Sequence, residues 1–361
     1  MTLAIVLATY AAVAVGRVPL LRIGRSGAAA LGAFLLIITG AIGVRDAAAA
    51  IDIRTIFLLL AMMILVAPLQ ITGVFGRVIA WVSRRVHHPA ALLAAIVVAS
   101  GGLSALFLND TICIAFTPLV LELAAIRGHE PLPYLLALAT ASNIGSVGTV
   151  VGNPQNILIG SVSGMSPWHF SAVLAPIAAA GLALDILIIW LIFRTQLVEQ
   201  PADRTSIAAA VRPGRVTFTA VARTIDWRLL VLFAGLFVVI GAVEHAGIDR
   251  RLFVLLQPLG LDTLAGLSAT AAVLSNTISN VPAVMLFTRV VPRLSDPHTA
   301  WLALAMASTL AGNLTILGSI ANLIVVEGAN RRGVHVRFGD YVRVGAPVTL
   351  ATMAFGVWWL M

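Results

Sequence analysis

Charge is scarce in this chain of 361 residues, because 11% of them are Asp, Glu, Lys or Arg whereas 60% are hydrophobic. Lysine is missing altogether, so all 23 basic residues are arginine, a compositional bias to which we attach no function. So little charge excludes a soluble globular domain and predicts an integral membrane protein. The net charge of +8 is therefore read as a signal of membrane orientation, and we expect no nucleic-acid partner.

Cysteine is almost absent as well. The single residue, Cys113, excludes an intramolecular disulfide and cannot by itself form a zinc or iron–sulfur site. The histidines lie in loops or at the ends of apolar segments, without metal-ligand spacing. No Gly-x-Ser-x-Gly, His-Glu-x-x-His or pair of intramembrane aspartates supports a membrane-embedded enzyme. We expect no enzymatic activity, and no cofactor apart from a coupling ion such as Na⁺.

Long apolar runs dominate what is present. They predict an all-α membrane protein with about eight full spans and two re-entrant hairpins, at 89–126 and 252–292. Each hairpin segment is apolar at both ends and polar in its middle; two full spans would also fit 89–126, and charge does not decide between them. The predicted spans are 2–16, 27–44, 55–75, 133–163, 168–193, 229–244, 299–327 and 340–360.

The arginines predict the orientation of these segments. Seventeen of them fall on one set of loops and six on the other, so the positive-inside rule places both termini outside an inner cell membrane. The most basic loop, 194–228, is then a cytoplasmic linker. The first hairpin opens toward the cytoplasm and the second toward the exterior. We divide the chain into N-terminal spans at 1–54, a first repeat at 55–193, the linker, and a second repeat at 229–361.

Two stretches rich in glycine and asparagine interrupt the apolar segments, at 141–160 and at 311–322. Glycine and proline break helices, and the freed backbone groups are tolerated at membrane depth only where they are buried in protein or line a polar cavity. Interrupted segments at corresponding places in two halves of a chain are typical of the binding sites of secondary transporters. We therefore predict broken helices at 133–163 and 299–327.

The two halves also match each other in sequence when one is displaced by 170 residues. The first unit begins outside and the second inside, so we predict an inverted repeat of the kind found in alternating-access carriers. Five polar pairs coincide at this offset: Asn109 with Ser279, Asp110 with Asn280, Asn143 with Asn313, Gly148 with Gly318, and Thr149 with Ser319.

The chemistry of such interruptions suits ions. Half-helix N-termini offer unpaired N–H groups to an anion, whereas half-helix C-termini, loop carbonyls and Asn, Ser or Thr oxygens suit a cation. The alternative is that small polar residues only let the helices pack closely. The candidate residues for substrate or ion binding are Asn109, Asp110, Thr111, Ser142, Asn143, Gly145, Gly148, Thr149, Asn153, Asn156, Ser279, Asn280, Gly312, Asn313, Thr315, Gly318, Ser319 and Asn322, with Na⁺ predicted at Asp110, Asn143, Asn280 and Asn313.

Asp110 is an acid at the predicted middle of the membrane, where ionisable residues are costly and usually functional. It could bind a cation or carry a proton, and it could also cap the helix that follows it. We favour a role in coupling. Asp185 and Glu122 also lie in apolar segments, but neither has a counterpart in the other half. Both are therefore interpreted as packing or interfacial acids.

Three passages resemble motifs of the ion transporter superfamily, which contains the divalent anion:sodium symporters, the arsenite permeases and the NhaD-type sodium/proton antiporters. The Asn109-Asp-Thr tip followed by Thr-Pro is close to the arsenite-permease form, whereas the carboxylate symporters have Ser-Asn-Thr at both tips. This chain has Ser-Asn-Val at the second tip. The resemblance implies a homodimer. The passages are 107–118, 142–156, and 279–282 together with 312–322.

Together these features predict a secondary active transporter in the lipid bilayer, moving a small anionic substrate or oxyanion by alternating access, with coupling to H⁺ or Na⁺. An arsenite or antimonite efflux permease and an NhaD-like sodium/proton antiporter are the alternatives. A channel would share the polar interruptions but would not show saturable, gradient-coupled flux. The substrate, the coupling ion and the direction of transport do not follow from the sequence.

Overall fold

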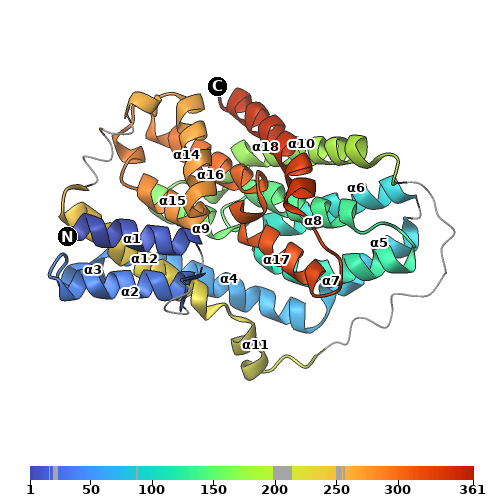
Figure 1. The fold of residues 1–361 in the computed structure, drawn as a ribbon, viewed down its shortest axis with the longest axis horizontal. Coiled ribbons are helices and arrows are strands. Elements are labelled where there is room, and N and C mark those ends of the chain that lie inside the picture. The colour runs from blue at the N-terminus through green and yellow to red at the C-terminus, as the bar shows by residue number, and fades with distance from the viewer. Residues whose placement is uncertain (16, 19–22, 87, 198–213, 249–253, 255–256) are drawn as a thin grey trace.

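The regular structure of the chain is almost entirely helical (Figure 1). In the described residues the exception is a pair of two-residue antiparallel strands, β1 (Arg17–Val18) and β2 (Ile23–Gly24). The predicted all-α fold class is thus confirmed. The computed structural model describes the chain except for residues 16, 19–22, 87, 198–213, 249–253 and 255–256.

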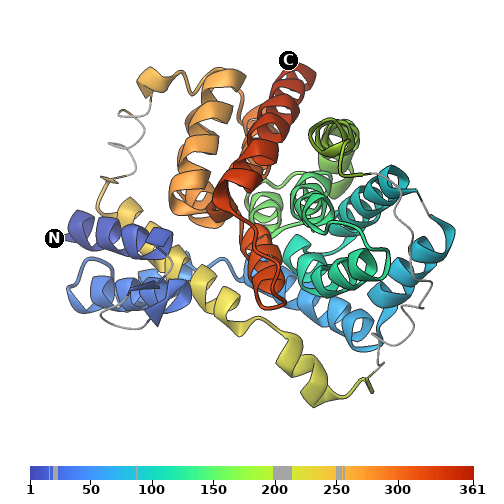
Figure 2. The same cartoon turned by 45° about the vertical axis from the view of Figure 1, so that its right-hand side comes forward.

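The N-terminal helices form a group with a helix from the second half of the chain. Helix α12 (Trp227–His245) packs along α2 (Arg25–Ile38) and contacts α3 (Val44–Ala50), and α2 also packs against α1 (Thr2–Val15). Figures 1 and 2 show these helices side by side, in blue and yellow, at the left of the molecule. Arg25 is the first residue of α2, so the packing of this group places one charged residue toward the centre of the fold.

The first half then builds a hairpin and an interrupted helix. The hairpin arms α6 and α7 meet at Phe107 and Leu108. Helix α8 ends at Val147, and the chain is irregular until α9 begins at Pro154. The interruption therefore lies inside the predicted segment 133–163. The helices are α4 (Ile53–Ile71), α5 (Val74–Arg85), α6 (Pro89–Leu106), α7 (Asn109–Ile126), α8 (Leu132–Val147), α9 (Pro154–Ser163) and α10 (Pro167–Phe193).

The second half has the same order of elements. Its hairpin arms α14 and α15 meet at Ser279, and α16 is separated from α17 by two short 3₁₀ turns, within the predicted segment 299–327. Residues 198–213 of the predicted linker and the start of the predicted second hairpin lie outside the described residues. The elements are α11 (Phe218–Thr224), η2 (Gln257–Leu259), α14 (Leu264–Ile278), α15 (Asn280–Phe287), η3 (Val291–Arg293), α16 (Pro297–Leu310), η4 (Ala311–Asn313), η5 (Ile316–Gly318), α17 (Ile320–Asn330) and α18 (Phe338–Leu360).

Five of the described helices are long and apolar enough to cross a membrane by themselves: α4, α6, α7, α10 and α12. They support an integral membrane protein, while the count of eight spans remains a prediction. Both arms of the first predicted hairpin, α6 and α7, are in this set. Their length alone therefore does not distinguish a re-entrant hairpin from two spans.

Close approach of backbones holds the interrupted helix against its hairpin. A Cβ atom on Gly145 of α8 would collide with the backbone of Gly101 in α6, and one on Gly152 would collide with the backbone of Ser146. Helices α6 and α8 can therefore touch at this point only because Gly145 lacks a side chain, and the absence of a side chain on Gly152 lets the interruption fold back onto the end of α8. Thr149 adds a hydrogen bond from its hydroxyl to the Ala105 carbonyl at the end of α6, at 2.5 Å.

Candidate functional site

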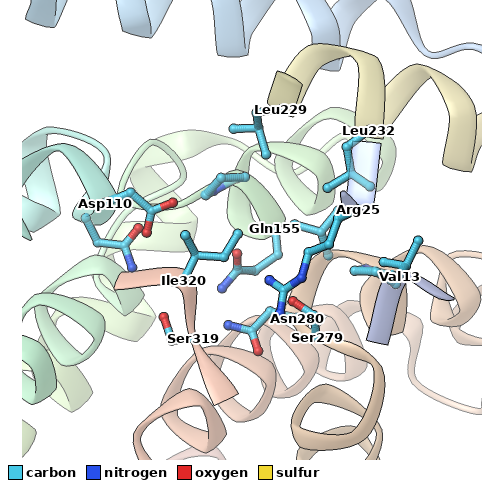
Figure 3. Close-up of a pocket in the computed structure, with 14 residues that line it drawn as sticks. Val13, Arg25, Asp110, Gln155, Leu229, Leu232, Ser279, Asn280, Ser319 and Ile320 are labelled. Carbon is cyan, nitrogen blue, oxygen red and sulfur yellow. The ribbon is translucent and has the colours of Figure 1, made fainter. Parts of the chain in front are cut away.

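A buried pocket collects the N-terminal ends of five helices (Figure 3). Four of these ends belong to the two hairpins and the two interrupted helices, and the fifth is Arg25 at the start of α2. The exposed N–H groups and the macrodipole at a helix N-terminus both favour negative charge. Residues lining the pocket are Val13, Arg25, Asn109, Asp110, Pro154, Gln155, Leu229, Leu232, Ser279, Asn280, Val281, Pro282, Ser319 and Ile320.

Both hairpin tips reach the interruption of a helix in their own half. At the first tip, the Asn109 N–H donates to the Gly152 carbonyl at 3.0 Å. At the second tip, the side-chain amide of Asn280 is oriented so that its nitrogen donates to the carbonyls of Ser308 and Gly318, both at 3.1 Å. The interruptions therefore receive hydrogen bonds from the tips, which satisfies carbonyls that the missing helical turn leaves open.

One asparagine closes each interruption from within. Asn156 Nδ2 donates to the carbonyls of Ser146 at 3.0 Å and Thr149 at 2.9 Å. Asn322 Nδ2 donates to the carbonyls of Gly312 at 2.7 Å and Thr315 at 3.0 Å. Each amide thus replaces the backbone donors that an unbroken helix would supply. Both side chains are fully buried, so these are structural partners of the interruption rather than groups that face the pocket.

Each second half-helix is also capped by its own side chain. Asn153 Oδ1 accepts from the Asn156 N–H at 2.8 Å at the start of α9, where Pro154 follows as the first helical residue. Ser319 Oγ accepts from the Ala321 N–H at 3.2 Å at the start of α17. Caps of this kind, with proline in the first turn, are the expected signals of a helix start.

The caps also cross between the halves of the chain. Asn153 Nδ2 donates to Thr309 Oγ1 of α16 at 3.3 Å, and Ser319 Oγ donates to Asn143 Oδ1 of α8 at 3.0 Å. These are the same contact with the two halves exchanged. Asn143 is therefore the counterpart of Thr309, and Asn153 that of Ser319.

The hydrogen bonds correct the residue pairs predicted from sequence. Around the interruptions they relate the halves at an offset of 166 residues, the separation of Asn156 and Asn322, and not at 170. At the tips, the first helical residues Asn109 and Asn280 correspond, so the predicted partner of Asn109, Ser279, is wrong. The connections between tip and interruption differ in length, which is why no single offset fits both.

A chain of amides ties the two interruptions together. Asn143 Nδ2 donates to Asn313 Oδ1 at 2.8 Å and to Asn322 Oδ1 at 3.0 Å. Asn143 Oδ1 accepts from Asn109 Nδ2 at 2.9 Å as well as from Ser319. Two of the oxygens predicted to bind Na⁺, on Asn143 and Asn313, therefore already accept hydrogen bonds from protein donors. A cation at either oxygen would have to displace those donors.

The eighteen predicted residues thus separate into groups. Those that line the pocket are Asn109, Asp110, Ser279, Asn280 and Ser319. Those in the buried network behind it are Ser142, Asn143, Asn153, Asn156, Asn313 and Asn322, and Ser142 accepts there from Cys113. Thr149 and Thr315 bind neighbouring segments, Thr111 lies in the first turn of α7 outside the pocket, and Gly145, Gly148, Gly312 and Gly318 lie in or beside the interruptions.

Sequence reasoning missed two polar residues of the pocket, Arg25 and Gln155. Figure 3 shows the Arg25 side chain reaching in toward Gln155, Ser279 and Asn280, with Asp110 across the pocket. Gln155 Nε2 donates to Thr309 Oγ1 at 3.1 Å, which fixes its position. Gln155 could have been found from its place in the Asn153–Asn156 motif, whereas no local signal marks Arg25.

The backbone at the second tip is strained. Ser279 has φ 78° and ψ 156°, and it is the only residue other than glycine with positive φ among the residues described. This conformation is nearly restricted to glycine and costs on the order of 1–3 kcal/mol. Leu108, at the same place in the first tip, has an ordinary φ of −57°. The second tip therefore stores strain at the wall of the pocket.

A wider cavity adjoins the pocket. The two share Arg25, Leu229, Leu232 and Ile320, and the cavity continues past Asp226, Arg228 and Glu327. Its walls come from the start of α2, the start of α12 and from α17. The pocket and the wider cavity are therefore neighbours, and Arg25 stands on the wall between them.

The sequence profile of a family described as citrate transporters matches residues 10–311, most of the chain. The chain belongs to the citrate transporter family. A silicon efflux transporter of Oryza sativa subsp. japonica is 30% identical, with 94% of this chain and 93% of that protein covered. The inner membrane protein YbiR of Escherichia coli (strain K12) is 28% identical over 81% of this chain and 84% of its own length.

A third relative, the putative transporter arsB of Dictyostelium discoideum, is 22% identical over 93% of this chain and 87% of that protein. Membership of the citrate transporter family confirms the resemblance to the anion permeases of the ion transporter superfamily, and makes the chain a membrane transporter for anions or related solutes. As a citrate transporter family member it carries its pocket where the motifs of the resemblance meet, at the two tips and the two interruptions.

Proposed function

We propose that this protein is a secondary active carrier for a small oxyacid, bound as an anion in the pocket beside Arg25. The observation that carries the proposal is the convergence of five helix N-termini, one of them bearing Arg25, on one buried pocket. Each N-terminus favours negative charge, and a guanidinium provides a fork of donors for a carboxylate or another oxyanion. The pocket is therefore built for an anion.

The polar groups of the pocket also suit hydroxyl groups on such a substrate. Asn109 Oδ1 is buried without a hydrogen-bond partner among the described residues, so a ligand hydroxyl would satisfy it. Gln155 adds a side-chain carbonyl beside it. The silicon efflux transporter and the putative arsB transporter among the relatives support an oxyacid of this type.

Two inverted repeats would give this site access to both membrane faces in turn. The matched contacts of Asn153 with Thr309 and of Ser319 with Asn143 support such a relation between the halves. In this arrangement, the wider cavity beyond Arg25 is the cytoplasmic entrance, in an inner membrane with both chain termini outside. Asp110 and the neighbouring amides are where a coupling H⁺ or Na⁺ binds, and the carrier works as a homodimer.

The test is an uptake screen in proteoliposomes with citrate with and without Mg²⁺, phosphate, sulfate, silicic acid, arsenite and antimonite, each with and without Na⁺ and pH gradients. We expect saturable uptake of one class of these solutes. Arg25→Gln should raise the half-saturation concentration about tenfold, the loss of one charge-assisted hydrogen bond. The matched control is Arg228→Gln, which removes an exposed positive charge from the wider cavity and leaves the pocket intact.

Sodium/proton antiport is the second candidate, because Asp110 is an acid in the pocket. A pH-sensitive dye inside proteoliposomes distinguishes the two. Na⁺-driven proton flux without any oxyacid from the screen would favour the antiporter. Absence of uptake for every solute in the screen would overturn the oxyacid proposal.

A further inference from the structure

Asp185 is an acid that the pocket does not use. It lies in the middle of α10, an apolar helix long enough to cross a membrane, and its side chain is fully buried. From sequence it was interpreted as a packing acid. A buried acid inside an apolar helix is costly unless it has a partner or a function, so its surroundings decide between these interpretations.

Its one hydrogen-bond partner among the described residues is the hydroxyl of Thr140 in α8, which is 3.1 Å from Asp185 Oδ2. The same hydroxyl is 2.9 Å from the Leu136 carbonyl. A threonine hydroxyl has one proton to donate, so it cannot make a full hydrogen bond to both acceptors. Unless the single Thr140 proton is shared between the two acceptors, both hydrogen bonds form when Asp185 carries a proton on Oδ2 and donates to Thr140, which then donates to Leu136.

In the described part of the chain no ion pair with Asp185 is found. Its second oxygen, Oδ1, has no hydrogen-bond partner there. Tyr341, a buried titratable residue, lies on α18, which packs against α10. Other titratable or charged residues on the described helices packed against α10 stand near the ends of those helices: Tyr134 on α8, His298 on α16, and Asp340 and Arg343 on α18.

A proton fits this environment better than a metal cation does. Na⁺ and other hard cations take several oxygen ligands, and here the carboxyl group meets one hydroxyl partner. No group of three or more His, Cys, Asp or Glu residues suited to a metal occurs in the described part of the chain. The carboxyl group with Thr140 therefore holds what a single proton requires: one oxygen to carry it and one acceptor to receive it.

Asp185 is connected to the substrate pocket through the amides that tie the interruptions together. The carbonyl of Thr140 accepts from Asn313 Nδ2 at 3.2 Å. Asn313 accepts in turn from Asn143, and Asn143 accepts from Asn109 and Ser319 at the pocket wall. Thr140, the hydrogen-bond partner of Asp185, thus also holds one end of the network that positions both helix interruptions.

We propose that Asp185, with Thr140 as its partner, is a proton-binding site of the carrier that is separate from the substrate pocket. In its protonated form the acid donates to Thr140; when it gives the proton to water on one side of the membrane, the Thr140 hydroxyl turns from Leu136 to the carboxylate. The role of this proton in driving transport rests on the proposed function. The existence of the site does not.

Infrared spectroscopy of the purified full-length protein in lipid nanodiscs tests the site without any substrate. We expect the C=O stretching band of a buried, protonated carboxylic acid at neutral pH. Asp185→Asn should remove this band, and Thr140→Val should shift its frequency without removing it. Glu122→Gln is the matched control, since Glu122 is a half-buried acid in an apolar helix, and it should leave the band unchanged. If the wild type has no such band, or if Asp185→Asn has the same carboxylic acid bands as the wild type, the proposal is overturned.

Transport tests the coupling. Whichever of citrate, silicic acid or arsenite the wild type moves is measured twice, as downhill exchange and as accumulation driven by a pH gradient. Asp185→Asn copies the protonated shape, so exchange should stay within about twofold while accumulation falls at least about tenfold. Glu122→Gln should keep both activities. Unchanged accumulation in Asp185→Asn overturns the coupling role. If the wild type moves none of the three solutes, the result counts against the oxyacid proposal. The infrared measurement still tests whether Asp185 binds a proton.

Discussion

The two helix interruptions are built alike, whereas the two hairpin tips beside them are not. Each interruption has a bridging asparagine and a side-chain cap that reaches across to the other half. The first tip carries Asp110 on a relaxed backbone, and the second carries uncharged Asn280 after strained Ser279. The bridging and capping side chains at the interruptions thus occur in both halves, whereas the charged residue at the tip occurs in one. Function-specific chemistry is expected where the halves differ.

The largest effect should follow from removing a bridging asparagine. Asn156→Ala and Asn322→Ala each leave two buried carbonyls without donors, at about 1–3 kcal/mol for each carbonyl. Asn322→Ala should cost roughly 1 kcal/mol more, because Asn322 also accepts from Asn143, whereas Asn156 Oδ1 has no partner among the described residues. Thermal unfolding in detergent measures the difference. Equal stability of both variants and the wild type would mean that the interruptions do not need these bridges.

The next effect concerns the unequal charge. Asp110→Asn makes the first tip resemble the second and should reduce the dependence of transport on the coupling gradient on the order of tenfold or more. The double variant Asp110→Asn with Asn280→Asp moves the acid to the second tip. It should restore part of the gradient dependence if coupling requires an acid in the pocket at either tip. The measurement is initial uptake at fixed substrate with and without Na⁺ and pH gradients. Unchanged gradient dependence in Asp110→Asn would remove Asp110 from the coupling mechanism.

The strain at the second tip predicts a stabilising substitution. Ser279→Gly relieves a conformation that costs on the order of 1–3 kcal/mol, against about 0.5–1 kcal/mol for the added freedom of glycine in the unfolded chain, so a gain of about 1 kcal/mol is expected. Ser279→Ala is the control, because it removes the hydroxyl and keeps the strain. It should bring no gain. If the melting temperature rises equally in both variants, the gain comes from removal of the hydroxyl and not from relief of strain.

The smallest effect lies at the starts of the two interrupted helices. Asp296 caps α16 by accepting from the Thr299 N–H at 3.1 Å, whereas Pro131 at the start of α8 offers no side-chain cap. Asp296→Ala should cost about 0.5–1 kcal/mol at neutral pH. Hydrogen bonds from Thr299 lower the pKa of Asp296 below its ordinary value of 3.8, so the cap stabilises above that value and is lost as the pH falls through the lowered pKa.

A difference between wild type and Asp296→Ala that persists unchanged at acid pH would contradict this assignment of the cap. Asp296→Asn serves as its control, since the amide oxygen can still accept from Thr299 but does not titrate. That variant should lose the pH dependence and keep most of the stability.

The fold and the place of the site could be predicted from sequence because the signals are local. Gly148, Gly152 and Pro154 cannot continue an α-helix without loss, and Asn153 marks the new start, so the first interruption is readable in a few residues. The wrong residue pairs have a different origin. An offset chosen to align identical or similar residues takes no account of hydrogen bonds. Asn143 and Thr309 correspond by the hydrogen bonds that they make, although their side chains differ.

Arg25 and Asp185 could not be assigned from sequence, because their roles depend on distant partners. Arg25 lies outside both predicted repeats and reaches the pocket only because α2 packs along α12. Asp185 has no counterpart in the other half, and its significance arises from one hydroxyl in another helix, 45 residues away. Such partnerships are set by tertiary packing, which local composition does not encode.

The tie between Asn143 and Asn313 has a consequence for how the protein is made. Its two residues are 170 positions apart, so while the ribosome is still producing the second half, Asn143 has no amide partner there. An unpaired amide is costly in the lipid interior. The first interruption therefore acquires its final form late, after the C-terminal helices have been inserted, and a truncated chain that ends before α16 would leave it open.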